Sequence, residues 1–375
     1  MDKKRIIILG ATGSIGKNSL AVCRELSHRF EVVGLSAHGS AAALKILGEE
    51  WGVTRLALSG TEGASGFPYR GAAGLVALIR ETQAEMVLNG ISGAAGFEPT
   101  LEALRCGRDL ALANKESVIL GGRLLFDLAR QNGARILPVD SEHSALDHLL
   151  RGEEPGPAEE LILTASGGPF RLYSPEEMKR ITVKEALHHP TWNMGPKITI
   201  DSATLANKGL EIMEAFYLFN MPPEKIKVII HPQSHVHSLI RTRDGVLYAQ
   251  ISPPNMVHPI QNALTYPDIL ESSLKPLDLE GLELTFAPVN GNQFPMIPLA
   301  YQALQAGGGY PIAYNAANEV AVDAFLMEEL SFTGIPDLVD RVLQKDWSRE
   351  QKDFEQIRHT DQAAREAAAE LRRFI

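Results

Sequence analysis

A short apolar strand followed by a glycine-rich turn opens the chain and restricts its fold more than any other feature. Residues 3–9 form a β-branched run, and the turn after it reads Gly10-Ala-Thr-Gly13-Ser-Ile-Gly16 before helical sequence over 17–26. Glycines let a backbone turn sharply and approach a pyrophosphate, whose charge a helix N-terminus favours. The spacing is GxxGxxG rather than GxGxxG. It predicts a variant dinucleotide-binding turn, with a tight turn that binds nothing as the alternative.

The end of the second predicted strand bears on which dinucleotide would bind. NAD-preferring folds usually carry an acidic residue there, which accepts a hydrogen bond from the ribose 2′-hydroxyl. Here the sequence reads Ser36-Ala37-His38-Gly39-Ser40, without an acid. A 2′-phosphate would not be repelled, and His38 and Ser40 are its only obvious donors. NADP is therefore favoured over NAD.

Short apolar runs separated by helical sequence continue to about residue 143. They lie at 31–35, 56–58, 86–88, 109–112 and 135–139. Strands that alternate with helices predict a doubly wound α/β sheet. This part of the chain, residues 1–144, is expected to form a Rossmann-like NADP-binding domain.

Two further domains are expected after a loop at 152–157. Mixed strand and helix patterns predict a central α+β catalytic domain over 145–286, and mostly helical sequence predicts a connector and C-terminal helical domain over 287–375. The expected strands are 161–164, 228–230 and 246–251, and the expected helices are 210–218, 314–330 and 360–374, the last with Asp361 as a candidate cap.

Composition narrows the class of protein. The 375 residues carry a formal net charge of -10, which makes a general affinity for nucleic acid or for an anionic membrane unexpected. The apolar run before the first glycine is only four residues long, too short for a signal or membrane segment. Cys23 and Cys106 form no CxxC pair and are expected to be plain thiols. A cytoplasmic enzyme is the expectation.

Three carboxylates are candidates for a metal site. Asp140 and Glu142 follow the last predicted strand of the first domain, where i and i+2 side chains of an extended chain point the same way. Glu211 is the third candidate. Oxygen ligands without thiolates suit Mg²⁺ or Mn²⁺. The alternative is that Asp140 only caps a helix beginning at Ser141 or Glu142.

Polar residues between 166 and 211 are candidates for binding an anion. Ser166-Gly-Gly follows a predicted strand, and helical spacing would bring Asn207 and Lys208 beside Glu211. Ser202 adds a further donor. The alternative for this helix is an exposed Lys–Glu pair worth only about 0.3–0.5 kcal/mol.

Other polar motifs have both a functional and a structural interpretation. Residues 188–197 contain Trp192 between prolines and a glycine and are expected to form a lid, with a structural loop around a buried tryptophan as the alternative. Asn114-Lys115-Glu116 places polar groups at the same sheet edge as the carboxylates, although such a tripeptide is common on surfaces. The histidines at 235 and 237 lie in strand-like sequence and are expected to be packed or hydrogen-bonded, not metal ligands.

In combination, these motifs resemble the 1-deoxy-D-xylulose 5-phosphate reductoisomerase family, whose members are NADPH- and metal-dependent enzymes of non-mevalonate isoprenoid synthesis. They occur in family order along nearly the whole chain. The matching segments are GATGSIG (10–16), LANKES (112–117), PVDSEH (138–143), SGGPFR (166–171), HPTWNMG (189–195), DSATLANKGLE (201–211), HPQSHVHS (231–238) and NAANEVAV (315–322).

The resemblance implies a role for each matching residue. Catalysis would fall to the three metal-binding carboxylates and one lysine, and the cofactors would be NADPH and Mg²⁺ or Mn²⁺, with Co²⁺ as a further candidate. The metal ligands would be Asp140, Glu142 and Glu211; the substrate contacts Lys115, Ser141, Glu142, Ser166, His189, Trp192, Ser202, Asn207, Lys208 and Glu211; the cofactor contacts Thr12, Gly13, Ser14, Ile15, Gly39, Ser40, Asn114, Glu116 and Gly195.

The implied reaction rearranges a phosphorylated sugar, 1-deoxy-D-xylulose 5-phosphate, to the aldehyde 2-C-methyl-D-erythrose 4-phosphate, which takes a hydride from NADPH and leaves as the polyol. The family forms homodimers. Two departures stand out. Gly39-Ser40 occupies the place of a basic residue and an asparagine, and Pro254-Asn255-Met256 replaces Pro-Asp-Met, with Val257 and His258 also different.

Two other functions stay open at this point. A semialdehyde dehydrogenase also favours a GATGxxG opening, but it needs a nucleophilic cysteine in a polar cleft. A non-catalytic NADP-binding sensor would keep the glycine turn without needing three carboxylates, a lysine and a lid.

Overall fold

The computed structural model describes residues 3–60, 62–151, 158–192 and 194–375. The chain divides into two compact units. The first comprises Met1–Ser117, Leu125–Ser144 and Asn255–Lys275, and the second Val118–Leu124, Ala145–Pro254 and Pro276–Ile375. The loop expected at 152–157 and Asn193 of the expected lid lie outside the described residues. The division into three domains stays a prediction.

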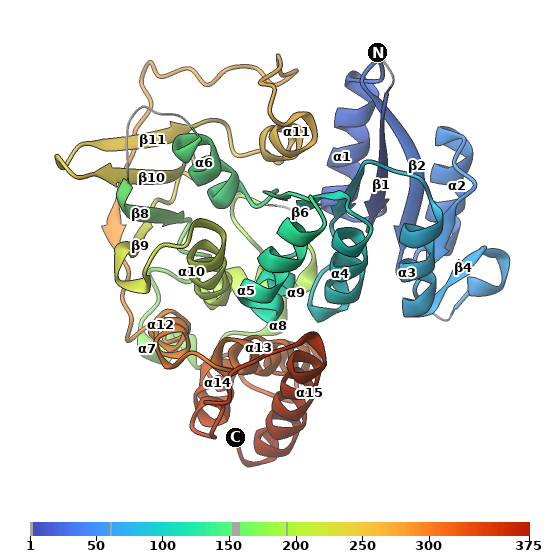
Figure 1. Cartoon of the computed structure of the whole chain (residues 1–375). Coiled ribbons are helices and arrows are strands. Elements are labelled where there is room, and N and C mark those ends of the chain that lie inside the picture. The colour runs from blue at the N-terminus through green and yellow to red at the C-terminus, as the bar shows by residue number, and fades with distance from the viewer. Residues whose placement is uncertain (1–2, 61, 152–157, 193) are drawn as a thin grey trace. The chain divides into compact units, whose positions relative to one another are not determined.

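A parallel sheet of seven strands forms the centre of the first unit, as the alternating pattern predicted (Figure 1). The strand order is β4-β3-β2-β1-β5-β6-β7, so the chain starts in the middle and builds outward in both directions. The strands are β1 Lys4–Leu9, β2 Phe30–Ala37, β3 Leu56–Leu58, β4 Tyr69–Arg70, β5 Met86–Asn89, β6 Asp109–Leu112 and β7 Ile136–Pro138. The two-residue β4 was not predicted, because it is too short to show a pattern.

Helices join these strands and cover the sheet. They are α1 Ser14–Glu25, α2 Ala41–Trp51, α3 Gly71–Glu81, α4 Phe97–Arg105, α5 Lys115–Gln131 and α6 Ser141–Leu150, with short 3₁₀ turns η1 Ala64–Gly66 and η2 Ala94–Gly96. The helical geometry of α5 is interrupted at Gly122 (φ 47°, ψ −139°). The sheet is apolar on both faces, and Ile6 to Leu9 of β1 are fully buried, as expected for a parallel sheet covered on two sides.

A helix from much later in the chain completes this core. Helix α11, Val257–Thr265, lies beside α1 (Figure 1). It buries Ile260, Ala263 and Leu264 in the same cluster as β1. Each such buried leucine or isoleucine side chain stabilises the fold by about 1.5–3 kcal/mol.

The second unit contains a mixed sheet with the order β11-β10-β8-β9-β12. Its strands are β8 Ala158–Ala165, β9 Ile226–Ile230, β10 Val236–Thr242, β11 Leu247–Ile251 and β12 Ala287–Pro288. Strands β8 and β9 are parallel, and the other neighbours are antiparallel.

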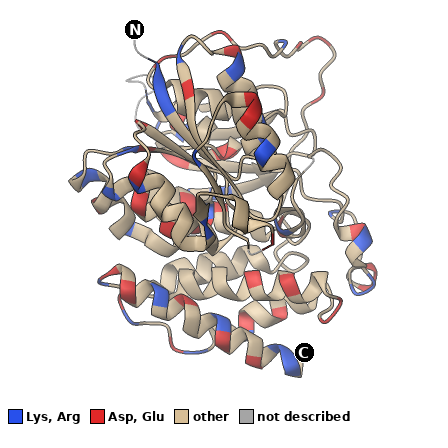
Figure 2. Ribbon diagram, turned by 90° about the vertical axis from the view of Figure 1, so that its right-hand side faces the viewer, with Lys and Arg blue, Asp and Glu red and all other residues tan. Residues whose placement is uncertain are grey.

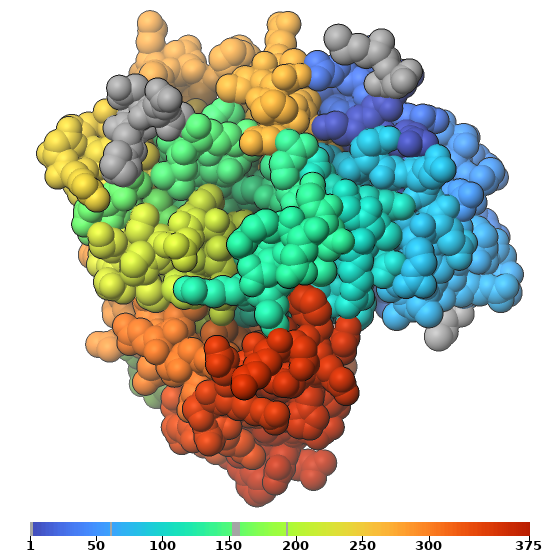
Figure 3. All heavy atoms as spheres, viewed as in Figure 1, coloured from blue at the N-terminus to red at the C-terminus, as the bar shows by residue number. Residues whose placement is uncertain are grey.

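Helices make up most of the second unit. They are α7 Pro175–Met178, α8 Val183–Ala186, α9 Pro196–Ala203, α10 Ala206–Phe219, α12 Met296–Ala306, α13 Tyr310–Leu326, α14 Gly334–Leu343 and α15 Phe354–Leu371, with η3 Pro223–Lys225 and η4 Arg372–Phe374. The last three α-helices pack against one another (Figure 1), and their atoms belong to the orange-red to red part of Figure 3. The expected cap Asp361 was wrong. Helix α15 starts earlier, and Asp353 caps it by accepting from the Gln356 amide at 2.8 Å.

Charge is spread along the ribbon, with acidic and basic residues interspersed (Figure 2). Among the described residues, no helix combines the length and the apolar character that crossing a membrane requires.

Candidate active site

The glycine-rich turn adopts the geometry that its spacing predicted. Gly10 has φ +76°, and a Cβ there would lie 2.8 Å from the Gly90 carbonyl oxygen. A Cβ on Gly16 would lie 2.4 Å from Ala11 Cα, so α1 packs directly on the turn. Gly13 is the N-cap residue of α1, and its position receives no side-chain cap within the described chain. The first amides of α1 are thus exposed to an anion rather than to a capping oxygen.

The end of β2 lacks a basic side chain but contains a histidine–serine contact. His38 Nδ1 lies 3.0 Å from Ser59 Oγ, which follows β3. Ser40 is the N-cap residue of α2 without a side-chain cap bond. A Cβ on Gly39 would meet no atom within 4 Å, so the position is sterically open to a longer side chain.

Asn114 and Glu116, expected to contact the cofactor, shape a backbone loop in this structure. Asn114 Nδ2 donates to the carbonyl oxygens of Ile91 and Gly93, both at 2.8 Å, and Oδ1 accepts from the Ser117 amide at 2.9 Å. Glu116 Oε1 accepts from the Gly93 amide at 3.2 Å. Both side chains are buried. They hold the segment after β5 beside the glycine-rich turn, and sequence alone did not show this function.

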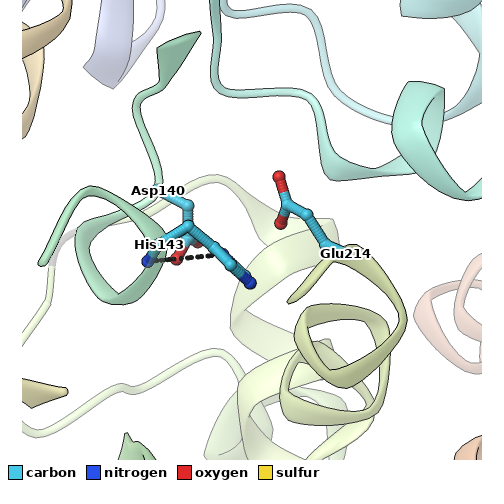
Figure 4. A group of neighbouring side chains, drawn as sticks. All are labelled: Asp140, His143 and Glu214. Carbon is cyan, nitrogen blue, oxygen red and sulfur yellow. Dashed lines mark hydrogen bonds and ion pairs between the residues drawn. The ribbon is translucent and has the colours of Figure 1, made fainter. Parts of the chain in front are cut away.

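Asp140 is the centre of a polar cluster in the first unit. It follows β7, and its carboxylate lies 2.8 Å from Lys115 Nζ. The carboxylate also lies 3.0 Å from His143 Nδ1 (Figure 4). Asp140 Oδ1 also accepts from the Glu142 amide at 3.1 Å, so it does cap α6 as the alternative interpretation held. Capping and ligand binding are compatible, because a carboxylate offers about four lone-pair sites. The buried His143 was not singled out from the sequence.

Glu142 lies in the first turn of α6, beside Ser141. The Ser141 hydroxyl donates to Glu142 Oε2 at 2.6 Å. Both side chains are partly exposed, which leaves them accessible to a ligand.

Helix α10 carries the third predicted ligand with its two neighbours. As predicted, the residues are helical here, and Asn207 Nδ2 donates to Glu211 Oε1 at 2.5 Å while Lys208 pairs with Oε2. Lys208 and Glu211 are 3% and 0% exposed. The alternative of an exposed Lys–Glu pair is therefore wrong, because this pair is buried. Glu214, one turn further along α10, is a second buried carboxylate (Figure 4) that the sequence did not point to.

Ser166 and His189 meet in the second unit. Thr191 and Trp192 amides donate to His189 Nδ1 at 3.1 and 2.9 Å, so the ring proton must lie on Nε2. Nε2 then donates to Ser166 Oγ at 3.2 Å. Burial, with the neighbouring His188, lowers the pKa of His189 to about 4, so the ring is neutral at pH 7.

This arrangement makes Ser166 a donor. Its oxygen also accepts from the Gly168 amide at 3.2 Å, so both incoming bonds use lone pairs and the hydroxyl hydrogen is left to donate. Gly167 and Gly168 have φ +83° and +66°, and a Cβ on Gly168 would lie 2.8 Å from the Ser202 carbonyl oxygen. The turn and the end of α9 are thus in direct contact.

Ser202 and Lys208 lie on consecutive helices that are separated by two residues, Thr204 and Leu205. Leu205, between α9 and α10, has φ +59° and ψ 15°, the left-handed region that bulky residues rarely adopt. Gly195 is the N-cap residue of α9, and Trp192 is half-buried just before it. The expected lid therefore leads directly into the helix that carries Ser202.

The chemistry of the three predicted metal ligands suits a hard divalent cation. Asp140, Glu142 and Glu211 offer only carboxylate oxygens, which Mg²⁺ and Mn²⁺ prefer. Two of these carboxylates already pair with a cation, Asp140 with Lys115 and Glu211 with Lys208.

Neither cysteine has the environment of a catalytic nucleophile. Burial raises the pKa of Cys23 to about 12 and also raises the pKa of Cys106. A thiolate is the reactive form, so the semialdehyde dehydrogenase alternative loses its nucleophile.

Two residues of the other motifs, His231 and Asn255, make structural contacts. His231 Nδ1 lies 2.9 Å from the Thr285 carbonyl oxygen, and its ring stacks on Phe286 at 4.8 Å. Asn255 Oδ1 accepts from the Val257 amide at 2.8 Å at the start of α11. An aspartate could accept the same bond, so the Pro-Asn-Met departure keeps the oxygen that accepts from the Val257 amide.

Comparisons with known proteins identify a single family over nearly the whole chain. Family models match at residues 6–122 (1-deoxy-D-xylulose 5-phosphate reductoisomerase), 136–219 (its C-terminal domain) and 251–367 (DXP reductoisomerase C-terminal domain). Enzymes of that name from Treponema denticola and Protochlamydia amoebophila are each 43% identical, over 98% of this chain and 97% and 98% of theirs.

Solved structures give the same result. A DOX-P reductoisomerase in complex with NADPH, fosmidomycin and magnesium has a TM-score of 0.91 at 36% identity, covering 99% of this chain and 98% of its own. The reductoisomerase from Zymomonas mobilis in complex with NADPH has a TM-score of 0.89 at 36% identity, with 99% of both chains covered. The chain belongs to the 1-deoxy-D-xylulose 5-phosphate reductoisomerase family.

Proposed function

We propose that this chain catalyses the NADPH- and divalent-metal-dependent rearrangement and reduction of 1-deoxy-D-xylulose 5-phosphate in non-mevalonate isoprenoid synthesis, in the cytoplasm. The observation that carries the proposal is the full-length family match at 43% identity in a chain that retains every residue implied for the metal and the phosphate. The relatives' ligands, NADPH and magnesium, are what its own glycine turn and carboxylates suit.

The substrate phosphate would bind to the second unit. The Ser166 hydroxyl is oriented to donate, the end of α9 brings Ser202 against the same turn, and Lys208 supplies positive charge. Asn207 adds an amide, and the neutral His189 adds hydrogen bonding without titrating near pH 7. Binding energy from this non-reacting group would help to position the carbons that rearrange.

The reacting end of the substrate would lie at the carboxylates. Asp140, Glu142 and Glu211 would hold the divalent ion, which when bound supplies Lewis-acid polarisation of the substrate's oxygens. Lys115, held on Asp140 at 2.8 Å, adds fixed positive potential where negative charge develops. Ser141 would contact the substrate beside them. Trp192 and the rest of the lid would exclude water.

The cofactor would bind along the first unit. Thr12, Gly13, Ser14 and Ile15 would contact its pyrophosphate at the start of α1, and NADPH would supply the hydride. Asn114 and Glu116 would act by holding the loop at Gly93 in place, and Gly195 by approaching the cofactor without a side chain.

The test is NADPH oxidation by the purified chain with 1-deoxy-D-xylulose 5-phosphate, with and without Mn²⁺, and with NADH in parallel. Metal-dependent oxidation of NADPH is expected. A folded protein that binds NADPH but turns over neither cofactor would support the sensor alternative instead.

The metal assignment is tested by Glu211→Gln, which keeps the side chain's shape but removes the charge. Turnover at limiting Mn²⁺ should nearly disappear, whereas Glu355→Gln, on the exposed surface of α15, should leave it unchanged. A near-normal rate for Glu211→Gln would contradict the assignment.

We also propose that the chain forms a homodimer through β11. This strand lies at one end of its sheet, and Leu247, Tyr248 and Ile251 are 46%, 39% and 41% exposed. An exposed apolar edge strand readily pairs with a second chain. Light scattering should show a dimer that Leu247→Lys with Ile251→Lys converts to monomer. An unchanged mass for the double variant would exclude β11 as the interface.

A further inference from the structure

Helix α13 carries a buried polar face that no step of the proposed reaction uses. Tyr314, Asn315 and Asn318 are all 0% exposed. Burying polar side chains costs free energy unless their hydrogen bonds are regained. The partners of these side chains therefore indicate what the face is for.

Asn318 bonds to the helix that carries Ser202. Its Nδ2 donates to Asp201 Oδ1 at 2.8 Å, and Lys197 Nζ lies 2.8 Å from Asp201 Oδ2. Asp201 is 1% exposed, so its carboxylate is held on both oxygens away from water. Since Asp201 directly precedes Ser202, a bond that fixes Asp201 also fixes the rotation of α9 about its axis.

Tyr314 touches the helix that carries Lys208. A Cβ on Gly209 would lie only 2.3 Å from the Tyr314 hydroxyl, so the backbone of α10 lies directly against that group. The hydroxyl donates to the Met296 carbonyl oxygen at 3.0 Å. Burial, together with Asp201, raises the pKa of Tyr314 well above its ordinary value, so the donor keeps its proton.

We propose that α13 is the positioning scaffold of the phosphate site, with Asn318 acting through Asp201 to place Ser202. Tyr314 acts through Gly209 to place Asn207 and Lys208. Neither residue touches the substrate. The inference rests on the proposed phosphate role of these donors, and it assigns a function to the NAANEVAV segment beyond packing. Donors to one phosphate must be held closely in register, because displacement of about 1 Å can cost a factor of about 100 in activity.

The experiment exchanges the side chains of Asn318 and Asp201. Asn318→Asp sets a second carboxylate against Asp201 and should shift α9. Combining it with Asp201→Asn restores the pair in reverse: the new amide donates to the new carboxylate, and its oxygen still faces Lys197. The matched control is Asn315→Asp, equally buried on α13, where Asn315 Nδ2 donates to Glu319 at 3.1 Å rather than to α9.

Four quantities are measured for each variant: kcat and KM for 1-deoxy-D-xylulose 5-phosphate, the thermal shift produced by inorganic phosphate, and the Kd of NADPH. For Asn318→Asp we expect KM to rise at least about tenfold, with a smaller change in kcat, and to return to within about threefold of wild type in the exchanged pair. The phosphate-induced shift should be lost and regained in parallel, while the Kd of NADPH stays constant. Asn315→Asp should lower stability without raising KM.

An unchanged KM and an unchanged phosphate shift in Asn318→Asp would overturn the scaffold. So would a KM that stays high in the exchanged pair after its stability has recovered. If wild type lacks turnover but the phosphate shift follows the pattern, the proposed function fails and the scaffold stands. If Asn318→Asp does not fold, Asn318→Ser removes the amide without adding charge, and the same direction is expected.

Discussion

The contact between Gly209 and Tyr314 gives a prediction whose size follows from the distances. In Gly209→Ala the new methyl would lie 2.3 Å from the Tyr314 hydroxyl and 3.1 Å from Ala300 Cβ and the Met296 carbonyl oxygen. The first distance requires a displacement of roughly 1 Å, whereas the other two require only a few tenths of an ångström. Overpacking of this kind costs about 1–3 kcal/mol, offset by about 1 kcal/mol from the better helix propensity of alanine.

Tyr314→Phe removes the group that the methyl would strike. On its own it should cost about 0.5–1.5 kcal/mol, because the Met296 carbonyl loses the hydrogen bond from the Tyr314 hydroxyl. In the double variant the closest contact no longer exists. The double variant should therefore be less destabilised than the sum of the single variants, by about 1–2 kcal/mol.

Urea denaturation of the four proteins, followed by circular dichroism, measures this coupling. Gly291→Ala is the control, because its Cβ would meet only Pro298 atoms at 3.8 and 3.9 Å. It should change stability little. Single-variant effects that add within about 0.5 kcal/mol would refute the argument, since additivity means that the two groups do not interact.

Three further predictions test the cofactor turn and the histidine. Gly16→Ala, whose Cβ would lie 2.4 Å from Ala11 Cα, should displace α1 and weaken NADPH binding measured by fluorescence titration. Gly39→Lys should raise the NADPH over NADH affinity ratio about tenfold, since a charged donor would reach the 2′-phosphate. His189→Gln should lose less unfolding free energy than wild type between pH 7 and 5. Burial lowers the pKa of His189 in the folded state from 6.5 to about 4. As the pH is lowered from 7 to 5, the unfolded chain therefore takes up a proton before the folded chain does, and the free energy of unfolding of the wild type decreases.

The two glycine predictions have matched controls, and the histidine prediction has an outcome that would contradict it. Gly39→Ala adds a methyl in open space and should leave NADPH binding unchanged, in contrast to Gly16→Ala. Gly39→Gln has reach without charge and should not change the affinity ratio. For His189, equal losses of stability in variant and wild type would show that its ring titrates normally.

Much of the fold could be predicted, because its signals are local. Short β-branched runs ending at glycine predict buried parallel strands, and the strands at 56–58 and 109–112 have the predicted bounds. The place of α11 could not be predicted. Its sequence shows only an amphipathic helix, and its partner α1 is more than 200 residues away, a separation also spanned by the Lys4–Leu264 hydrogen bond.

Some contacts of the candidate site could likewise be predicted from local sequence, and others could not. The Asn207, Lys208 and Glu211 contacts follow from helical spacing and were predicted. The orientation of Ser166 was not, since it depends on a histidine ring fixed by the backbone at Thr191 and Trp192. Nor does local sequence show that Asn318 reaches Asp201, because 117 residues separate them.

Leu205 has one more consequence. A leucine at φ +59° costs roughly 1–3 kcal/mol that a glycine would not, yet glycine would leave the joint between α9 and α10 with many accessible conformations. Leu205 is 3% exposed and packs into the core, so the junction between α9 and α10 has a single conformation. Ser202 and Lys208 are then arranged before any phosphate arrives. The entropy of ordering them is lost during folding and not on binding, so a small anion can be bound tightly by few contacts.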